Sequence, residues 1–394
     1  MFLHRELRAI TASRVLRQAS VGLVNVYIPL IMLSRGAQIW QVCAFYLAYS
    51  AAKLAVNYPS MLLINRYGVQ LGMQAAILFS MLHLASLTVY VSTGGDLPAY
   101  AGAVSLALTN SFLWNSEHLH VSRVLAPERK GRDIAVMTIL QGAAALFAPL
   151  AGGLAMAAGG QVLTLCLAVA LAMCAAWPAR RLDRIGTGHQ PVRVIKYSLW
   201  HAPLRDSVAN FSFNVNATTF STVWPVYLAL TIGSFATLGW VVFAAELISL
   251  ALMFVAGRRG DGKGRRVLLE GSVATGFLNC LRILATTPMA LAGLGGALQA
   301  AASYQQTSWT SIYYGHARRN GPNYIMSLEI AGDLANIAVW GALLASFRLF
   351  DGTTQQFTAV FVTAGIASLG CLLISKEPAT APPSPAELRT VGNT

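Results

Sequence analysis

Apolar residues run along this chain in long blocks that shorter polar segments separate. A helix needs about 20 residues to cross the hydrocarbon core of a bilayer, so an apolar block of that length predicts a membrane span. The blocks predict twelve spans and an all-α integral membrane protein. The predicted spans are residues 14–33, 38–64, 71–92, 97–120, 133–157, 161–179, 206–230, 235–256, 267–286, 288–314, 323–347 and 355–375.

One polar and basic stretch, residues 180–205, divides the spans into two sets of six. It predicts a cytoplasmic linker between two six-helix bundles, residues 1–179 and 206–375. Residues 376–394 are rich in Pro and polar residues, which predicts a disordered cytoplasmic tail. The N-terminal segment lacks the short apolar core and cleavage site of a signal peptide, so we expect it to be retained in the cytoplasm.

Composition narrows the function. Of the 394 residues, 55% are hydrophobic and 11% are charged, with a mean hydropathy of +0.56. Soluble domains carry about 25% charged residues, so an ordinary soluble enzyme is excluded. The five cysteines are scattered and lack metal-ligand spacing, which predicts packing residues. No catalytic motif appears, and the sequence predicts neither a cofactor nor a metal.

The positions of the basic residues along the chain explain the net charge of +13. Most Lys and Arg residues lie in the N-terminus, the tail and alternate loops, which is the positive-inside pattern of membrane proteins. The charge therefore indicates topology, and nucleic acid is not expected as a partner. We expect a multi-pass protein of a bacterial-type plasma (inner) membrane, monomeric, with both termini in the cytoplasm.

The two sets of spans repeat features in the same order. Tyr27-Ile-Pro29-Leu in span 1 corresponds to Val223-Trp-Pro225-Val in span 7, which lies 196 positions later. Trp114 in span 4 corresponds to Trp309 in span 10. Parallel six-span halves related by an axis along the membrane normal are typical of transporters, with substrate bound near the midplane between them.

The loop after span 8 carries a recognisable motif. Residues 257–266 read GRRGDGKGRR, which resembles the G-x-x-x-D-R-x-G-R-R loop of the major facilitator superfamily except for Gly262. The loop after span 2 is a weaker copy, with Asn65 in place of Asp. The resemblance implies the twelve-helix fold of that family and a role for both loops in cytoplasmic gating. The implied gating residues are Arg66, Gly68, Gly257, Asp261, Gly264, Arg265 and Arg266.

Span 5 contains a second family feature. Ala148-Pro-Leu-Ala-Gly-Gly153 is similar to the G-P-x-x-G-G motif of the family's proton antiporters. Pro149 removes a backbone hydrogen bond and bends the helix, while Gly152 and Gly153 allow close helix approach. A bent small-residue helix is the alternative interpretation. The Arg that those antiporters carry in span 4 is absent from residues 101–114.

Ionisable residues inside spans are costly and mark functional sites. Asp333 lies near mid-membrane in span 11, and Glu329 and Asn336 share its helical face, so this face is a candidate for binding protons or cations. Glu246 and Lys53 are candidates for coupling or substrate contact, with a buried structural role as the alternative. Arg282 lies near the outer end of span 9 and is expected to snorkel to the interface.

Span 4 ends in a polar and aromatic face. Trp114, Asn115 and His118 recur at helical spacing, with Glu117 beside them. Because His titrates near neutral pH, Glu117 and His118 are candidates for proton transfer or gating. Interfacial placement is the alternative, and metal binding is not favoured because adjacent helical positions point apart.

Spans 1, 7 and 10 carry polar groups that need partners or a wet cavity in a membrane. The candidate cavity residues are Asn25, Lys53, Trp114, Asn115, Asn210, Asn214, Tyr304, Thr307, Trp309 and Asn336. Such a cavity is polar and aromatic without strong charge, which favours a small amphiphilic or polar organic solute. Core packing of the aromatic residues is the alternative.

These features together predict a secondary active transporter that works by alternating access, with proton-coupled export of a small organic solute. Two alternatives stay open. One is a proton-coupled nutrient importer, because the basic residue of the drug exporters is missing from span 4. The other is a membrane scaffold or sensor without turnover, because the first loop motif is degenerate.

Overall fold

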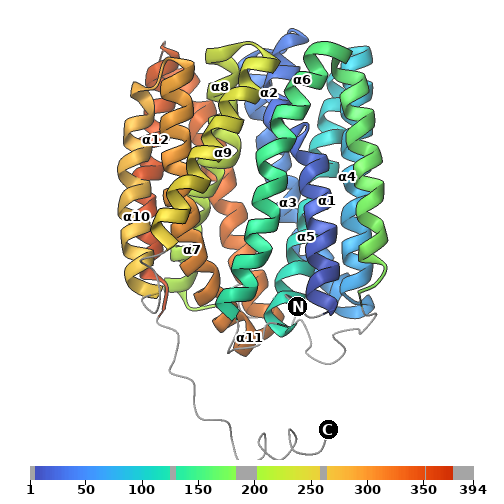
Figure 1. Cartoon of the computed structure of the whole chain (residues 1–394), viewed down its shortest axis with the longest axis vertical. Coiled ribbons are helices and arrows are strands. Elements are labelled where there is room, and N and C mark those ends of the chain that lie inside the picture. Colours follow the sequence, from blue (N-terminus) through green and yellow to red (C-terminus); the bar gives the residue numbers. More distant parts are fainter. Residues whose placement is uncertain (1–4, 125–129, 183–201, 258–263, 351, 376–394) are drawn as a thin grey trace, which may run out of the picture.

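The computed structural model describes residues 5–124, 130–182, 202–257, 264–350 and 352–375. Within these ranges the chain is helical almost throughout and contains no strand. The helices run side by side along the long axis of one body (Figure 1). The prediction of an all-α fold is confirmed for the described residues.

The helices fall into a first half, residues 5–182, and a second half, residues 202–375, which lie mainly on opposite sides of the view in Figure 1. The first half contains α1 (Arg5–Gly22), η1 (Asn25–Tyr27), α2 (Ile28–Ser34), α3 (Ile39–Tyr67), α4 (Val69–Thr93), α5 (Asp96–Val124) and α6 (Lys130–Ala179). The second half contains α7 (Leu204–Thr218), η2 (Thr219–Val223), α8 (Trp224–Ile232), α9 (Phe235–Gly257), α10 (Gly264–Leu281), η3 (Arg282–Leu284), α11 (Pro288–Leu349), α12 (Thr353–Gly370) and η4 (Cys371–Leu373).

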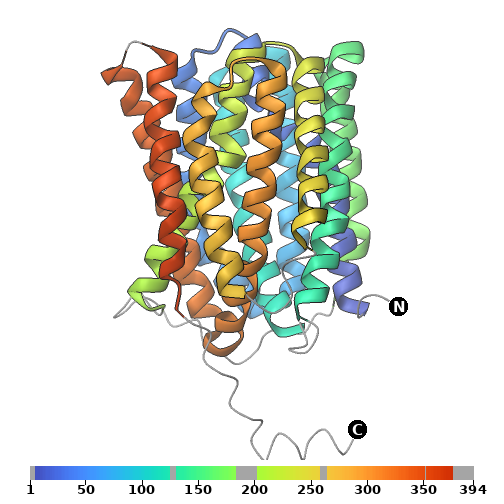
Figure 2. The same cartoon turned by 60° about the vertical axis from the view of Figure 1, so that its left-hand side comes forward.

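Two helices turn back on themselves. α6 has 50 residues and α11 has 62, so each is far longer than the roughly 30 Å hydrocarbon core requires. α6 reverses at Gly160 (φ 83°) and α11 at Gly321 (φ 68°), a backbone region that glycine enters without steric cost. Figures 1 and 2 show the α6 turn at the upper end of the body and the α11 turn at the lower end. Both turns fall between predicted spans.

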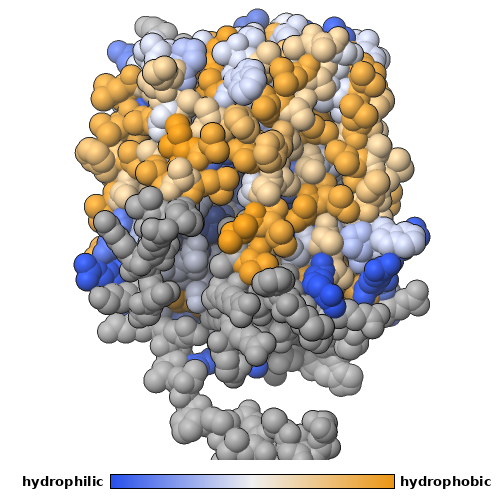
Figure 3. All heavy atoms as spheres, in the orientation of Figure 1, coloured by the Kyte–Doolittle hydropathy of each residue, from blue (hydrophilic) through white to orange (hydrophobic). Residues whose placement is uncertain are grey.

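Eight helical stretches in the described residues are long and apolar enough to cross a membrane. α5 and the α7–α8 pair are not among them. Figure 3 shows a broad belt of hydrophobic side chains on the visible face, with hydrophilic side chains gathered toward its ends. The chain is therefore a membrane-embedded protein.

The first helix of each half breaks at a matching place. After α1 the chain passes through the 3₁₀ turn η1 before α2 begins, with Pro29 in its first turn. After α7 it passes through the π-helical turn η2 before α8 begins, with Pro225 in its first turn. Proline has no backbone N–H, so it is accepted in the first turn of a helix. It cannot donate the hydrogen bond that would join that turn to the preceding one. The repeated sequence around these prolines thus marks a repeated structural break.

The halves pack against each other through several helix pairs. α3 and α5 contact α11, α6 contacts α9, and α2 contacts α8. The largest buried apolar cluster draws residues from both halves. In it, the ring of Tyr46 in α3 stacks on Trp340 in α11, with 4.5 Å between the ring centroids. The α3–α11 contact also carries the candidate site.

Candidate functional site between the two halves

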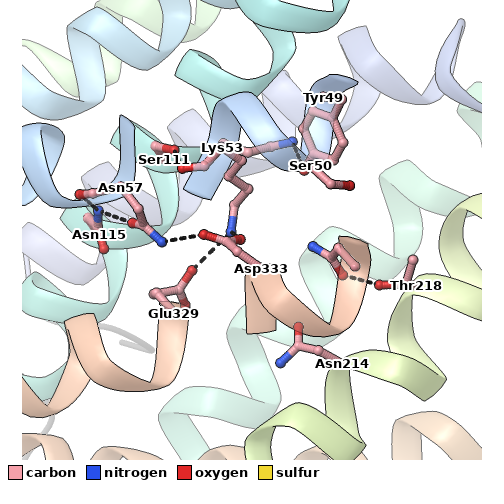
Figure 4. Close-up of polar contacts among 12 residues, drawn as sticks. Tyr49, Ser50, Lys53, Asn57, Ser111, Asn115, Asn214, Thr218, Glu329 and Asp333 are labelled. Carbon is pink, nitrogen blue, oxygen red and sulfur yellow. Dashed lines mark hydrogen bonds and ion pairs between the residues drawn. The ribbon is translucent and has the colours of Figure 1, made fainter. Parts of the chain in front are cut away.

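Lys53 lies near the middle of α3 and pairs with two acids of α11. Its Nζ donates to Asp333 Oδ1 at 2.5 Å and to Glu329 Oε2 at 3.2 Å (Figure 4). Glu329 and Asp333 are four residues apart in one helix, so both carboxylates face α3. The Asp333 side chain is fully buried, and those of Lys53 and Glu329 are 7% and 14% exposed. This ion network joins the first half to the second.

Amide side chains complete the network on the α3–α5 side. Asn57 Nδ2 donates to the second oxygen of Asp333 at 2.6 Å. Asn115 Nδ2 in α5 donates to Asn57 Oδ1 at 2.7 Å and lies 2.9 Å from Ser60 Oγ. Each oxygen of Asp333 therefore receives a donor from α3, and α5 orients the amide that supplies one of them. Lone pairs of a buried carboxylate need such donors.

His118 of α5 extends the network toward the lower end of the body. Its Nε2 lies 3.4 Å from Glu329 Oε1, and its Nδ1 lies 3.0 Å from the hydroxyl of Tyr314. Its ring stacks on Trp114 with 5.5 Å between the centroids. Both ring nitrogens of His118 thus have partners in the second half, so a change in its protonation alters contacts between the halves.

Glu117 belongs to a neighbouring ion pair. Arg14 Nη1 of α1 lies 2.6 Å from Glu117 Oε1, and the Glu117 side chain is 2% exposed. Arg17, one turn further along α1, donates to Asn110 Oδ1 of α5 at 3.1 Å. Arg14 and Arg17 therefore bind α1 to α5 within the first half, whereas Lys53 reaches across to the second half.

The charges around Lys53 do not balance without a proton. When both acids are ionised and His118 is neutral, one positive charge faces two negative charges. Adding one proton, on a carboxylate or on His118, makes the network neutral. Burying an uncompensated charge costs several kcal/mol, so the network has a strong electrostatic reason to bind one proton. It can therefore act chemically as a proton-binding site that also links the halves.

Two cavities lie between the halves beside this network. The lower cavity holds about 400 Å³ and is lined by α1, α5, α6, α9 and α11, including Arg14, Trp114, Glu117, His118 and Tyr314. Figure 3 shows a hollow in the lower part of the visible face with hydrophilic side chains inside it.

The upper cavity holds about 270 Å³ and is lined by both broken helices, with Asn25 on one side and Phe220, Ser221 and Trp224 on the other. Gln18, Glu246 and Gln299 line both cavities, and Gln299 Nε2 donates to Glu246 Oε1 at 2.9 Å. The Glu246–Gln299 pair thus lies where the two cavities meet.

The structure brings together most of the predicted ionisable residues. Lys53, Glu329, Asp333 and His118 share the ion network, and Glu117 lies beside them in the lower cavity wall. Glu246 is separate and lines both cavities. Among the described residues, no group of three or more His, Cys, Asp or Glu side chains is placed to hold a metal ion.

The predicted cavity residues divide into two groups. Asn25 lines the upper cavity, and Trp114 and Thr307 line the lower one. The others have different places: Asn115 holds Asn57, Asn210 donates to Leu328 O, Asn214 donates to Asn210 O, Asn336 accepts from Thr218, Tyr304 donates to Glu270, and Trp309 stacks on Phe213. Asn210 and Thr218 of α7 thus bond to the second arm of α11, whereas the Asn214 bond stays within α7.

The structure describes most but not all of the predicted gating residues. Asp261 lies outside the described residues, and Gly257 and Gly264 flank that gap at the ends of α9 and α10. Arg265 donates to Leu372 O at 3.0 Å and to Ile374 O at 3.3 Å, while Arg266 pairs with Glu270 one turn away.

In the first copy, the Arg66 guanidinium lies 5.2 Å from the Tyr67 ring centroid, and Gly68 precedes α4 with φ 94°. Both copies therefore make contacts within their own half, and Arg265 joins α10 to the segment that follows α12.

The Pro149–Gly153 segment of α6 packs against the break in the first helix. A Cβ at Gly152 would collide with the backbone of Leu23, and one at Gly153 would lie 2.5 Å from Phe235 O. The Tyr27 hydroxyl donates to Pro149 O. Gly152 and Gly153 thus allow α6 to approach the Leu23 backbone and the start of α9 closely, and Pro149 also lines the upper cavity.

Sequence reasoning missed several residues of this site. Asn57, Arg14 and Arg17 are not among the predicted site residues, and the two arginines lie at the start of predicted span 1. The spacing Lys53-x-x-x-Asn57 on one helical face was the available signal. The expectation that Arg282 snorkels to the interface is wrong, because its side chain is fully buried among aromatic rings.

No protein-family model matches the chain, and no curated protein matches it either.

Proposed function

We propose that the chain is a secondary active transporter of the major facilitator type, which exports a small organic solute in exchange for protons. Counting α1 with α2 and α7 with α8 as single crossings, and each arm of α6 and α11 as one, gives the twelve spans of that architecture. The cytoplasm then lies at the lower end, where α1 begins and α12 ends.

The observation that carries this proposal is the ion network that spans the halves beside the cavities. Alternating access requires the halves to separate on one side and then on the other. Lys53 in one half holds Asp333 and Glu329 in the other, so this link must loosen whenever α3 moves away from α11. Because one proton balances the network, proton binding is coupled to the strength of that link.

The cavity walls support an organic solute. Glutamine and serine side chains line the two cavities together with Trp114, Trp224 and Phe220. Aromatic faces bind apolar rings and chains, while amides and hydroxyls orient polar groups. The combined volume suits a molecule of metabolite size better than a bare inorganic ion.

The direct experiment is untargeted mass spectrometry of cells and medium, comparing the wild type with Asp333→Asn. Asp96→Asn is a matched control, since Asp96 is an exposed residue at the start of α5. We expect at least one compound enriched in the medium with wild type and Asp96→Asn but not with Asp333→Asn. Enrichment inside the cells would reverse the direction to import. Identical profiles for all three would contradict transport through this site.

A scaffold or sensor is tested separately, without knowing the solute. In a background without the native cysteines, Ser221→Cys reports the upper cavity and Thr307→Cys reports the lower one. A transporter predicts that an imposed proton gradient changes their reactivity toward a membrane-impermeant maleimide in opposite directions. Unchanged labelling of both positions would favour the scaffold.

A further inference from the structure

Arg282 is a buried cation without a buried anion. It begins η3 after α10, its side chain is fully buried, and it forms no ion pair with any described residue. Its Nη1 donates weakly to Thr219 O at 3.4 Å, while Nε and Nη2 have no hydrogen-bond partner. An arginine remains protonated in proteins, so this guanidinium offers unused, charged donors in a dry environment.

Aromatic rings cover the guanidinium. Its central carbon lies 4.4 Å from the ring centroid of Trp224, 5.4 Å from Phe220 and 5.5 Å from Phe361. Cation–π contacts of this kind hold a desolvated cation, but they leave the N–H groups unsatisfied. Trp224 and Phe220 are also walls of the upper cavity, whereas Arg282 itself is not. The indole of Trp224 therefore stands between the cavity and the charge.

The backbone around Trp224 is irregular. The π-helical turn η2 ends at Val223, Trp224 begins α8, and Pro225 follows. Single π turns in α-helices are frequent at functional sites, and Pro225 removes a hydrogen bond that would hold α8 to the turn before it. Gly295 of α11 lies beside the indole, since a Cβ added there would be 3.6 Å from Trp224 Nε1. Glycine there leaves the indole more space than any other residue would.

We propose that Arg282 binds a carboxylate group of the transported solute, which reaches it from the upper cavity when the Trp224 indole moves aside. The inference rests on the proposed transport function and adds the chemical class of the solute. A carboxylate satisfies two guanidinium donors at once in the planar fork geometry of arginine. The rings of Trp224 and Phe220 then flank the apolar part of an organic acid.

The first test asks whether Trp224 screens Arg282. Phenylglyoxal modifies accessible guanidinium groups, and peptide mass spectrometry reports the extent of reaction at Arg282 alone. In purified full-length protein we expect slow modification in wild type and about tenfold faster modification in Trp224→Ala, a factor that corresponds to opening by about 1.4 kcal/mol. Trp240→Ala is the control, because Trp240 is 52% exposed and its ring packs on Phe243, outside the three rings that surround Arg282. Equal rates in the two variants would overturn the screening role.

The second test measures the ligand class directly and needs no transport. Binding of benzoate is compared with binding of benzamide, which has the same shape without the charge, by thermal shift of the purified protein at constant ionic strength. We expect benzoate to bind wild type about tenfold more tightly than it binds Arg282→Gln, as for the loss of one charge-assisted contact. Arg35→Gln, which removes an exposed positive charge at the same end of the body, should leave binding unchanged.

The outcomes separate this inference from the transport proposal. Equal binding of benzoate and benzamide to wild type, or unchanged benzoate binding in Arg282→Gln, would overturn carboxylate recognition while leaving transport intact. Partial binding by Arg282→Lys, which keeps the charge but loses the fork, would support it. Loss of proton-driven transport in Asp333→Asn with intact benzoate binding would show that the two sites act separately.

Discussion

Lys53 and Arg282 are both cations buried among membrane helices, yet their surroundings differ in kind. Lys53 has two carboxylates from the opposite half, whereas Arg282 has three aromatic rings from its own half. Carboxylates neutralise a cation and accept its hydrogen bonds, and the resulting ion pair holds together the helices that carry the two partners. Aromatic faces hold a cation less tightly and leave its hydrogen-bond donors free. The comparison assigns different roles to the two cations: Lys53, which is paired with acids, links the halves, and Arg282, whose donors are free, is suited to bind a ligand.

The largest expected effect comes from removing the cation of the linked site. Lys53→Met leaves Asp333 and Glu329 buried without a positive charge, and we expect destabilisation by about 3–5 kcal/mol. The melting temperature of the purified protein in detergent measures it. The double variant Lys53→Met/Asp333→Asn should recover part of the loss, since one negative charge is gone. No recovery would mean that Lys53 acts through packing alone.

Removing one acid should cost less. In Asp333→Asn, Lys53 keeps Glu329 as its partner, so we expect a loss of about 1–3 kcal/mol and normal insertion in the membrane. The amide keeps the shape of the side chain but cannot take up a proton, so proton-driven flux should disappear. Normal flux in this variant, measured in vesicles with an imposed proton gradient, would remove Asp333 from the coupling mechanism.

The close packing near the upper cavity gives a third effect. Gly152→Ala places a methyl group against the Leu23 backbone, where the break in the first helix passes, and should cost about 1–3 kcal/mol. Gly293→Ala is the matched control, because a Cβ there meets no atom within 4 Å. Equal melting temperatures for the two variants would show that the α1–α6 approach can relax without penalty.

The smallest effect is expected at Arg282, and it sharpens the contrast with Lys53. Arg282→Met removes a buried charge that has no acid partner, so we expect a change within about 1 kcal/mol of wild type. The same change at Lys53 should be several times larger. A loss at Arg282 equal to that at Lys53 would mean that the guanidinium is chiefly structural.

The helical layout could be predicted well, because the length of an apolar run and the glycine or proline residues at its ends are local signals in the sequence. Each predicted span lies mostly within a described helix, and the reversals at Gly160 and Gly321 fall between predicted spans. The number of membrane crossings and the family stay predictions. Asp333 and Glu329 could also be found, since depth and helical spacing suffice to put two acids on one face.

Partners distant in the chain could not be found. Lys53 and Asp333 are 280 residues apart, and the sequence around either residue does not indicate that the two side chains will meet. The expected interfacial position of Arg282 is wrong for the same reason. Its three rings come from η2, α8 and α12, so proximity to the outer end of α10 suggested an interface where tertiary packing makes an interior.

The separation of Lys53 from its acids also has a consequence for biogenesis. Ribosomes add about 5–20 residues per second, so the 280 residues between Lys53 and Asp333 take some tens of seconds to synthesise. During that interval the first half holds an ammonium group in the bilayer with neither acid present. The newly made first half is thus incomplete in charge as well as in packing, and insertion of α11 is the step that completes it.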